Sequence, residues 1–183
     1  MISTHFQDSL DVAQRVADSA EIKAAADAIA DKIVNCLRIG GKVMFCGNGG
    51  SAAIAQHLAA ELVGRYKRER PPFAAMSLTV DTSALTAIAN DYGYSEVFAR
   101  QLAALARRGD VLFVMSTSGR SQNVLYALEE ARKCGVTTIG LFGRNSNPCD
   151  TIICVPCDDT ALVQQAHLAI GHAIVAAVEE WMV

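Results

Sequence analysis

Five short apolar segments alternate with helical patterns along this chain, and this alternation constrains its fold more than any other feature. Each segment is nearly continuous in apolar character and is bounded by turn residues, which is typical of strands buried on both faces of a sheet. Strands and helices that alternate in this way predict βαβ units, and therefore a parallel sheet covered by helices. The expected strands cover residues 42–47, 72–78, 110–116, 137–143 and 151–157.

The helical patterns complete the predicted architecture. We expect an α/β fold, a three-layer αβα sandwich of the flavodoxin-like type with a central five-stranded parallel sheet, an N-terminal helical hairpin and a long C-terminal helix. No repeat or linker divides the chain, so residues 1–183 should form a single domain: N-terminal helices (1–40), the sheet with its flanking helices (41–158) and the C-terminal helix (159–183). The helical patterns cover residues 3–18, 21–39, 51–66, 83–90, 95–108, 121–135 and 160–182.

Composition excludes several classes of protein. Hydrophobic residues make up 51% of the chain and charged residues 19%, which is incompatible with disorder. The net charge of −3 disfavours nucleic acid as a partner, because proteins that bind phosphate backbones are normally basic. No continuous apolar run reaches the roughly 18 residues that a membrane span needs, and the polar N-terminus does not resemble a signal peptide. A cytoplasmic protein that binds neither nucleic acid nor membrane is expected.

The six cysteines are scattered through the chain, mostly in apolar segments. Without a secretory signal, free buried thiols are the expected state. Cys154 and Cys157 have the C-x-x-C spacing of redox proteins. A redox pair normally opens a helix, whereas this pair closes a predicted strand, so a redox role is disfavoured.

Two turns follow predicted strands at the edge where sheets of this class bind ligands. Residues 47–51 (GNGGS) can offer backbone N–H groups to an anion, and residues 116–121 (STSGRS) add hydroxyls at a helix start. Neither turn matches G-x-x-x-x-G-K-[ST] or G-x-G-x-x-G, which leaves dinucleotide binding as a weak alternative. The second turn could be a plain helix N-cap, but its hydroxyls exceed what a cap requires. Phosphate binding is therefore favoured there.

A possible metal and acid–base site follows from two later segments. His57 and Glu61 stand one turn apart on a predicted helix, and neighbouring apolar residues indicate that the pair is at least partly buried rather than a plain surface pair. In the last helix, Gln164 and His172 share a flank, whereas His167 diverges and is more simply a core residue. A set of His57, Glu61, Gln164 and His172 would suit zinc or a similar divalent ion.

Several stretches together resemble one known family. They are CGNGGSA, QHLAAELVGRY with ERP beyond it, LTAIANDYGY, GDVLFVMSTSGRSQNV and the pair Gln164 and His172. Over nearly its whole length the chain resembles the sugar isomerase (SIS) domain proteins and, within them, the phosphoheptose isomerases. The resemblance implies an aldose–ketose isomerase that converts sedoheptulose 7-phosphate to D-glycero-D-manno-heptose 7-phosphate through an enediol(ate). In the family this is the first step of ADP- or GDP-heptose synthesis for lipopolysaccharide or surface polysaccharide.

The resemblance also implies roles for individual residues. Glu61 and His172 would be the catalytic acid–base pair, and one zinc ion per subunit would be held by His57, Glu61, Gln164 and His172. The family is typically a homotetramer with active sites between subunits. The substrate would contact Asn48, Gly49, Gly50, Ser51, Glu61, Asn90, Asp91, Ser116, Thr117, Ser118, Ser121 and Gln164. Members often carry an Arg or an Asp–Arg pair just before the glutamine, where this chain has Ala161, Leu162 and Val163, which puts the exact sugar in question.

A second class of function has to be weighed against the enzyme. Some SIS proteins are not catalytic, and either sense sugar phosphates or bind the bacterial replication initiator. Such modules do not need an acid–base pair, so the presence of both Glu61 and His172 favours the enzyme. In either class the last helix, apolar almost all round, predicts a homo-oligomer.

Overall fold

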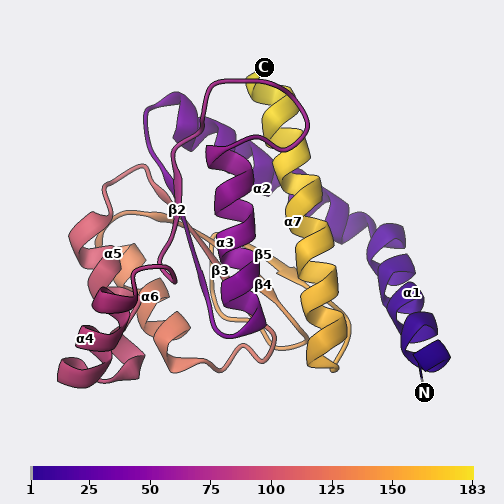
Figure 1. The fold of residues 1–183 in the computed structure, drawn as a ribbon. Coiled ribbons are helices and arrows are strands. Elements are labelled where there is room, and N and C mark those ends of the chain that lie inside the picture. The colour runs from indigo at the N-terminus through magenta and orange to yellow at the C-terminus, as the bar shows by residue number, and fades with distance from the viewer. Residues whose placement is uncertain (1) are drawn as a thin grey trace.

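The structure, a computed structural model, describes residues 2–183 and is built around one parallel sheet (Figure 1). The strand order is β2-β1-β3-β4-β5, and every neighbouring pair is parallel. This confirms the predicted five-stranded parallel sheet. The strands are β1 (Val43–Gly47), β2 (Ala75–Ser77), β3 (Val111–Ser116), β4 (Thr137–Phe142) and β5 (Thr151–Cys154).

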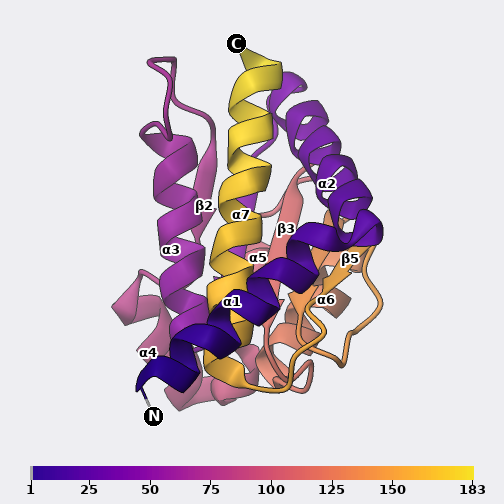
Figure 2. The ribbon, with the colours of Figure 1, turned by 90° about the vertical axis from the view of Figure 1, so that its right-hand side faces the viewer.

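Helices cover both faces of the sheet, as a parallel sheet requires. α2, α3 and α7 lie on one face, and α4, α5 and α6 lie on the other (Figure 1). α1 lies outside α7 (Figure 2). The helices are α1 (Ile2–Asp18), α2 (Ala20–Arg38), α3 (Gly50–Val63), α4 (Thr82–Tyr92), α5 (Ala99–Leu105), α6 (Gln122–Lys133) and α7 (Thr160–Met182), with a 3₁₀ turn, η1, at Tyr94–Glu96.

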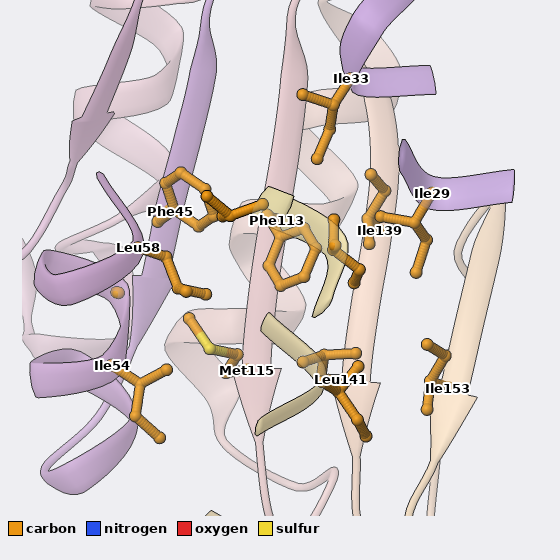
Figure 3. Close-up of a cluster of buried hydrophobic side chains, with 14 of the residues drawn as sticks. Ile29, Ile33, Phe45, Ile54, Leu58, Phe113, Met115, Ile139, Leu141 and Ile153 are labelled. Atoms are coloured by element: carbon orange, nitrogen blue, oxygen red, sulfur yellow. The ribbon is translucent and has the colours of Figure 1, made fainter. Parts of the chain in front are cut away.

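The core has one hydrophobic cluster on each face of the sheet, because side chains alternate along each strand. On the α2/α3/α7 face, Phe45 and Phe113 meet with ring centroids 5.3 Å apart, and Leu58 of α3 packs beside them (Figure 3). On the other face, Met44 and Leu112 pack against α5 and α6. All residues of the central strands β1 and β3 are buried, as their continuous apolar character predicted.

Three of the predicted segments were longer than the strands and helix in the structure, and local sequence features explain why. The expected strand 72–78 pairs with β1 only from Ala75, since Pro71 and Pro72 lack the N–H that a ladder needs. The expected strand 151–157 ends at Cys154, shortly before Pro156. The expected helix 95–108 is divided: its first residues belong to η1, and α5 begins only at Ala99.

The two N-terminal helices form an elbow instead of the expected hairpin. They are separated by Ser19 alone, whose side chain accepts a hydrogen bond from Ile22 N and so caps α2. One residue is too short to reverse the chain direction between two antiparallel helices. α1 instead crosses α7 (Figure 2), where Val12 is buried.

α7 is long and apolar enough to span a membrane by length and composition, with a mean hydropathy of 1.5. His167, His172 and the glutamines interrupt its sequence, so no continuous apolar run of membrane-spanning length appears there. Half of its most apolar window is buried inside the protein, between α2, α3 and α1. The core helix of a soluble protein has the same composition, so the fold accounts for the apolar character of α7.

Candidate active site

Three side chains that can bind a metal or move protons meet between α3 and α7. His57 and Glu61 extend from α3, and His172 extends from α7. His57 Nε2 lies 2.8 Å from His172 Nε2 and 3.2 Å from Glu61 Oε1. One ligand atom of each of the three residues lies within 4.8 Å of the other two. The structure thus brings together three of the four residues that the sequence suggested as metal ligands.

The packing of the two helices sets this geometry. α3 and α7 run side by side in both views (Figures 1 and 2). Gly171 allows their close approach, because a Cβ at this position would lie 2.7 Å from Leu58 Cδ1. Gly171 and Leu58 are the sequence neighbours of His172 and His57, so their contact brings the two imidazoles to the same level.

The cluster fits a divalent cation such as zinc. Two imidazole nitrogens 2.8 Å apart repel each other unless a proton or a cation lies between them. Zinc binds neutral imidazole and carboxylate at about 2.0–2.2 Å in tetrahedral geometry, so an ion beside the two nitrogens would contact both rings after they separate slightly. The side chains of His57 and Glu61 are 44% and 20% exposed, which leaves room for a small molecule at the same ion.

The turn between β1 and α3 forms one wall beside the cluster. Gly49 has φ = +55°, a conformation that favours glycine, and it precedes α3 without any side-chain cap. Ser51 is buried in the first turn of α3. The amides of Asn48 and Asn123 exchange two hydrogen bonds of 2.8 Å, and the Tyr94 hydroxyl donates to Asn48 Oδ1 at 3.0 Å. The predicted sugar-facing Asn48 is therefore held from two sides.

The turn between β3 and α6 gathers the predicted phosphate-binding hydroxyls. Ser116 Oγ lies 3.3 Å from Ser121 Oγ, and Gly119 N donates to Ser116 Oγ. Ser121 occupies the N-cap position of α6, but its side chain makes no capping hydrogen bond. The cap interpretation thus does not account for this hydroxyl, while the N–H groups that start a helix attract anions. Thr117 and Ser118 lie on the same turn, where Thr117 is half-buried and Ser118 is exposed.

Two other predicted substrate residues lie on the opposite face of the sheet from α7. Asn90 and Asp91 are exposed on α4, and Asn90 Nδ2 donates to Asp91 Oδ1 at 2.8 Å. α4 lies beside α5 and α6, across the sheet from α3 and α7 (Figure 1). Within one chain the structure does not join these two residues to the His57 cluster.

Gln164 also stands apart from the cluster. Its side chain lies over Gly50, where a Cβ would meet the Gln164 amide, so a larger residue at position 50 would displace that amide. Gly50 and His57 are seven residues apart on α3, about 10 Å of helix rise. In one chain Gln164 therefore belongs to the wall formed by the glycine turn, and the fourth ligand is not placed at the metal cluster.

Comparison with known proteins identifies the group to which this arrangement belongs. Residues 5–143 match the family model described as the SIS domain. The chain is 53% identical to the phosphoheptose isomerase of Bradyrhizobium sp. strain BTAi1, over 98% of this chain and 92% of that protein. The chain belongs to the phosphoheptose isomerases of the SIS-domain family.

Solved structures support the same assignment. The phosphoheptose isomerase of Neisseria gonorrhoeae superposes with a TM-score of 0.89 at 39% identity, covering 98% of this chain and 97% of that one. The phosphoheptose isomerase of Francisella tularensis gives a TM-score of 0.91, also at 39% identity, covering 98% and 96%. The full SIS-type sheet and its helices are therefore shared with proteins of this group.

Sequence reasoning missed several residues of this phosphoheptose isomerase that shape its site. Asn123 is 3% exposed and pairs with Asn48. Tyr66, in the loop after α3, stacks on His172 with ring centroids 5.4 Å apart and an interplanar angle of 22°. Tyr94 contacts Asn48. The run SQNV marked Asn123 as lying at a helix start, but no pattern in the sequence indicated its partner.

His167 is the core residue that the sequence suggested. It is fully buried, and its Nε2–H donates to the Phe142 carbonyl at 3.1 Å, while Nδ1 has no partner within residues 2–183. Burial lowers the pKa of His167 to about 4, although the bond to Phe142 opposes this shift. The imidazole is therefore neutral at physiological pH.

The six cysteines of the enzyme are all free thiols. Burial raises the pKa of Cys36 to about 11 and that of Cys149 to about 12, which makes both poor nucleophiles. Cys154 closes β5, and Cys157 is buried behind it. The C-x-x-C pair thus lies at the end of a strand and does not open a helix, as its position in the sequence predicted.

Proposed function

We propose that this phosphoheptose isomerase interconverts sedoheptulose 7-phosphate and D-glycero-D-manno-heptose 7-phosphate at the cluster of His57, Glu61 and His172. The observation that carries the proposal is the convergence of a carboxylate and two imidazoles within 4.8 Å, in a chain of this family. Heptose formation for lipopolysaccharide or surface polysaccharide, in the cytoplasm, is the corresponding cellular role.

Glu61 is proposed as the base that moves the carbon-bound proton. In the ketose, its carboxylate takes a proton from C1, and the C–H electron pair becomes the C1–C2 double bond of an enediolate while the charge moves to O2. The same proton, or one exchanged with water, then returns to C2. His172 is proposed to protonate O2 and to remove the proton from O1, so that the carbonyl group ends at C1. Both groups act in the reverse direction with donor and acceptor exchanged.

His57, Glu61 and His172 would also hold one zinc ion per subunit. When bound, zinc would supply Lewis-acid stabilisation of the negative charge that develops on the substrate oxygens. Gln164 is proposed primarily as a contact to the sugar, because its amide lies over Gly50. As a zinc ligand it would have to come from another copy of the chain.

The substrate phosphate is proposed to bind the turn after β3. Ser116, Thr117, Ser118 and Ser121 would donate hydroxyl hydrogens, and the first N–H groups of α6 would add to them. The sugar would then lie along the glycine turn, against Asn48, Gly49, Gly50 and Ser51. Asn90 and Asp91 would complete the site from a neighbouring subunit, since α4, on which they are exposed, lies across the sheet from α7 in their own chain.

The residues just before Gln164 set a limit on sugar recognition. Leu162 is buried and apolar, and Ala161 is exposed without a polar side chain. Neither can donate a hydrogen bond to a sugar hydroxyl, which the Arg or Asp–Arg of other members could do. The reaction type does not depend on this contact, but the choice among ketose phosphates does.

A proton-exchange assay tests the proposal. Sedoheptulose 7-phosphate is incubated with the protein in deuterium oxide, and NMR follows both the aldose product and deuterium at C1 and C2. Turnover with deuterium incorporation is expected. Binding of the sugar phosphate without exchange, in protein loaded with zinc, would instead support the non-catalytic alternative of a sugar-phosphate sensor or an initiator-binding module.

A further inference from the structure

A buried ion pair lies next to the His57 cluster but outside it. Arg70 Nε is 3.1 Å from Glu179 Oε1, and the two side chains are 0% and 3% exposed. Arg70 belongs to the loop of residues 64–71, which we call the strap, and Glu179 belongs to the last turns of α7. Figures 1 and 2 together show the strap above the end of α3, beside the C-terminal end of α7.

Glu179 organises the backbone of the strap. Its carboxylate accepts hydrogen bonds from the N–H groups of three successive residues, Tyr66 (3.1 Å), Lys67 (2.9 Å) and Arg68 (2.9 Å). Burial alone would raise the pKa of Glu179, but these N–H groups and Arg70 outweigh it and lower that pKa, so the carboxylate stays ionised.

Arg70 closes the C-terminal end of α3. Its guanidinium donates to the carbonyls of Glu61 (2.8 Å) and Leu62 (2.9 Å), which belong to the last turn of the helix and have no partner within it. It also donates to Gly64 and Pro71 within the strap. One side chain therefore ties the backbone of the proposed base, Glu61, to the strap.

The strap in turn supports the proposed acid. The Tyr66 ring stacks on the His172 ring. Lys67 Nζ also lies close to the Tyr66 ring, 5.0 Å from its centroid. Because Glu179 binds the N–H of Tyr66, the position of this ring depends on the ion pair. Arg70 and Glu179 thus reach both Glu61 and His172, each through one intermediate contact.

On these contacts, and resting on the proposed function, we propose that Arg70 and Glu179 are positioning residues for the isomerisation. They fix the strap so that Tyr66 holds the His172 ring and the end of α3 holds Glu61. A buried ion pair by itself contributes little net stability, because desolvation offsets its attraction. The contacts to Glu61 and Tyr66 therefore explain this pair better than a general contribution to stability does.

The experiment compares Glu179→Gln with a matched control, Asp110→Asn. Asp110 is also buried, pairs with Lys42, and accepts two backbone N–H groups, but these partners, Lys42 and Arg107, belong to the segments before β1 and β3 and not to the strap, α3 or α7. Both changes remove one buried carboxylate charge. We expect both to lower Tm, and only Glu179→Gln to lower kcat, by roughly 10- to 100-fold with little change in KM. Glu179→Gln should also lose zinc faster during dialysis against a chelator.

Two further variants keep the test decisive if Glu179→Gln does not fold. Arg70→Lys retains the charge but loses the forked contacts to the end of α3, and Tyr66→Leu removes the stacked ring while leaving the ion pair. Both should lower kcat and speed zinc loss, whereas Tyr66→Phe should restore wild-type values. Equal kcat and equal zinc loss in Tyr66→Leu and wild type would overturn the proposal. If the wild type turns over no ketose phosphate, the proposed function fails, and the zinc-loss comparison still decides the role of the strap.

Discussion

At the scale of single residues, the site is determined by which hydrogen-bonding groups can turn toward a ligand and which are fixed by their neighbours. Ser121 has a hydroxyl that does not cap its helix, and His57 and His172 bring two nitrogens together that need something between them. Asn48, in contrast, is fixed by Asn123 and Tyr94. The Ser121 hydroxyl, whose neighbour is another hydroxyl, and the two imidazoles can therefore turn toward a ligand or metal, whereas Asn48 defines a wall.

Replacing Glu61 by Gln should separate binding from chemistry. The amide keeps the shape of the side chain but cannot accept the carbon-bound proton, so isomerase activity should fall by about 10²- to 10⁴-fold. Binding of the sugar phosphate, measured by calorimetry, should persist because the turn after β3 is unchanged. Deuterium should no longer enter C1 or C2. The matched control is Glu129→Gln on the exposed face of α6, which should behave as wild type. Activity of Glu61→Gln within a few-fold of wild type would exclude Glu61 as the base.

His172→Ala should weaken both zinc retention and turnover, because one side chain serves as ligand and acid in the proposal. Chelation of the wild type should reproduce part of the loss of activity, and added zinc should restore it. Gln165→Ala is the appropriate control on α7, since Gln165 is exposed. His167→Ala is unsuitable because it would open a cavity in the core. Unchanged zinc content in His172→Ala would remove this residue from the ligand set.

His167 should make the stability of the protein depend on pH. Its pKa is about 4 when folded and about 6.5 when unfolded, so the unfolded chain binds the extra proton first as the pH falls. The free energy of unfolding should therefore decrease between pH 6.5 and pH 4, by about 3 kcal/mol at most. Urea unfolding at pH 7 and pH 5 measures the decrease. His167→Gln has no imidazole to titrate, so its unfolding free energy should decrease less between pH 7 and pH 5 than that of the wild type. An equal decrease in both proteins would show that His167 is not the cause.

At the scale of helices and strands, the turn after β3 should control phosphate affinity. A hydrogen bond to a charged group contributes about 1.5–3 kcal/mol, so Ser121→Ala should raise KM roughly 10- to 100-fold with a smaller effect on kcat. Ser118→Ala should act in the same direction. Ser83→Ala, at the exposed start of α4, is the matched loss of a hydroxyl and should leave KM unchanged. Unchanged kinetics in the Ser118/Ser121 double variant would place the phosphate elsewhere.

The elements that could be predicted from the sequence are those with a strong local pattern. The central strands β1, β3 and β4 follow from continuous apolar runs, and His57 and Glu61 follow from their helical spacing. The short edge strand β2 and the division of residues 95–108 depend on prolines and on packing, which periodicity does not report. The meeting of His57 with His172 depends on the contact between Gly171 and Leu58, and the pairing of Asn48 with Asn123 joins residues 75 positions apart. Such contacts between distant segments leave no local pattern.

At the scale of the whole molecule, the residues of the proposed site are not all brought together by one chain. Within residues 2–183, His57, Glu61 and His172 form the metal cluster, the side chain of Gln164 lies over Gly50, and α4 with Asn90 and Asp91 lies across the sheet from α7. α1 also projects over α7 with an exposed apolar stripe at helical spacing: Ile2, Phe6 and Leu10 are 78%, 69% and 58% exposed. A homotetramer, with α1 and α7 at subunit contacts, would cover this stripe and complete the sites.

Disrupting this stripe should therefore abolish assembly and activity together. Phe6→Glu places a charge at the centre of the stripe, where burial against another subunit would cost several kcal/mol. By light scattering we expect a wild-type tetramer and a smaller species for Phe6→Glu, with loss of isomerase activity although circular dichroism stays helical. Ile39→Glu is the matched control, because Ile39 is 73% exposed but lies at the end of α2, away from the stripe. A wild-type monomer at micromolar concentration that was fully active would show that one chain carries the whole site, and would require Gln164, Asn90 and Asp91 to act within it or not at all.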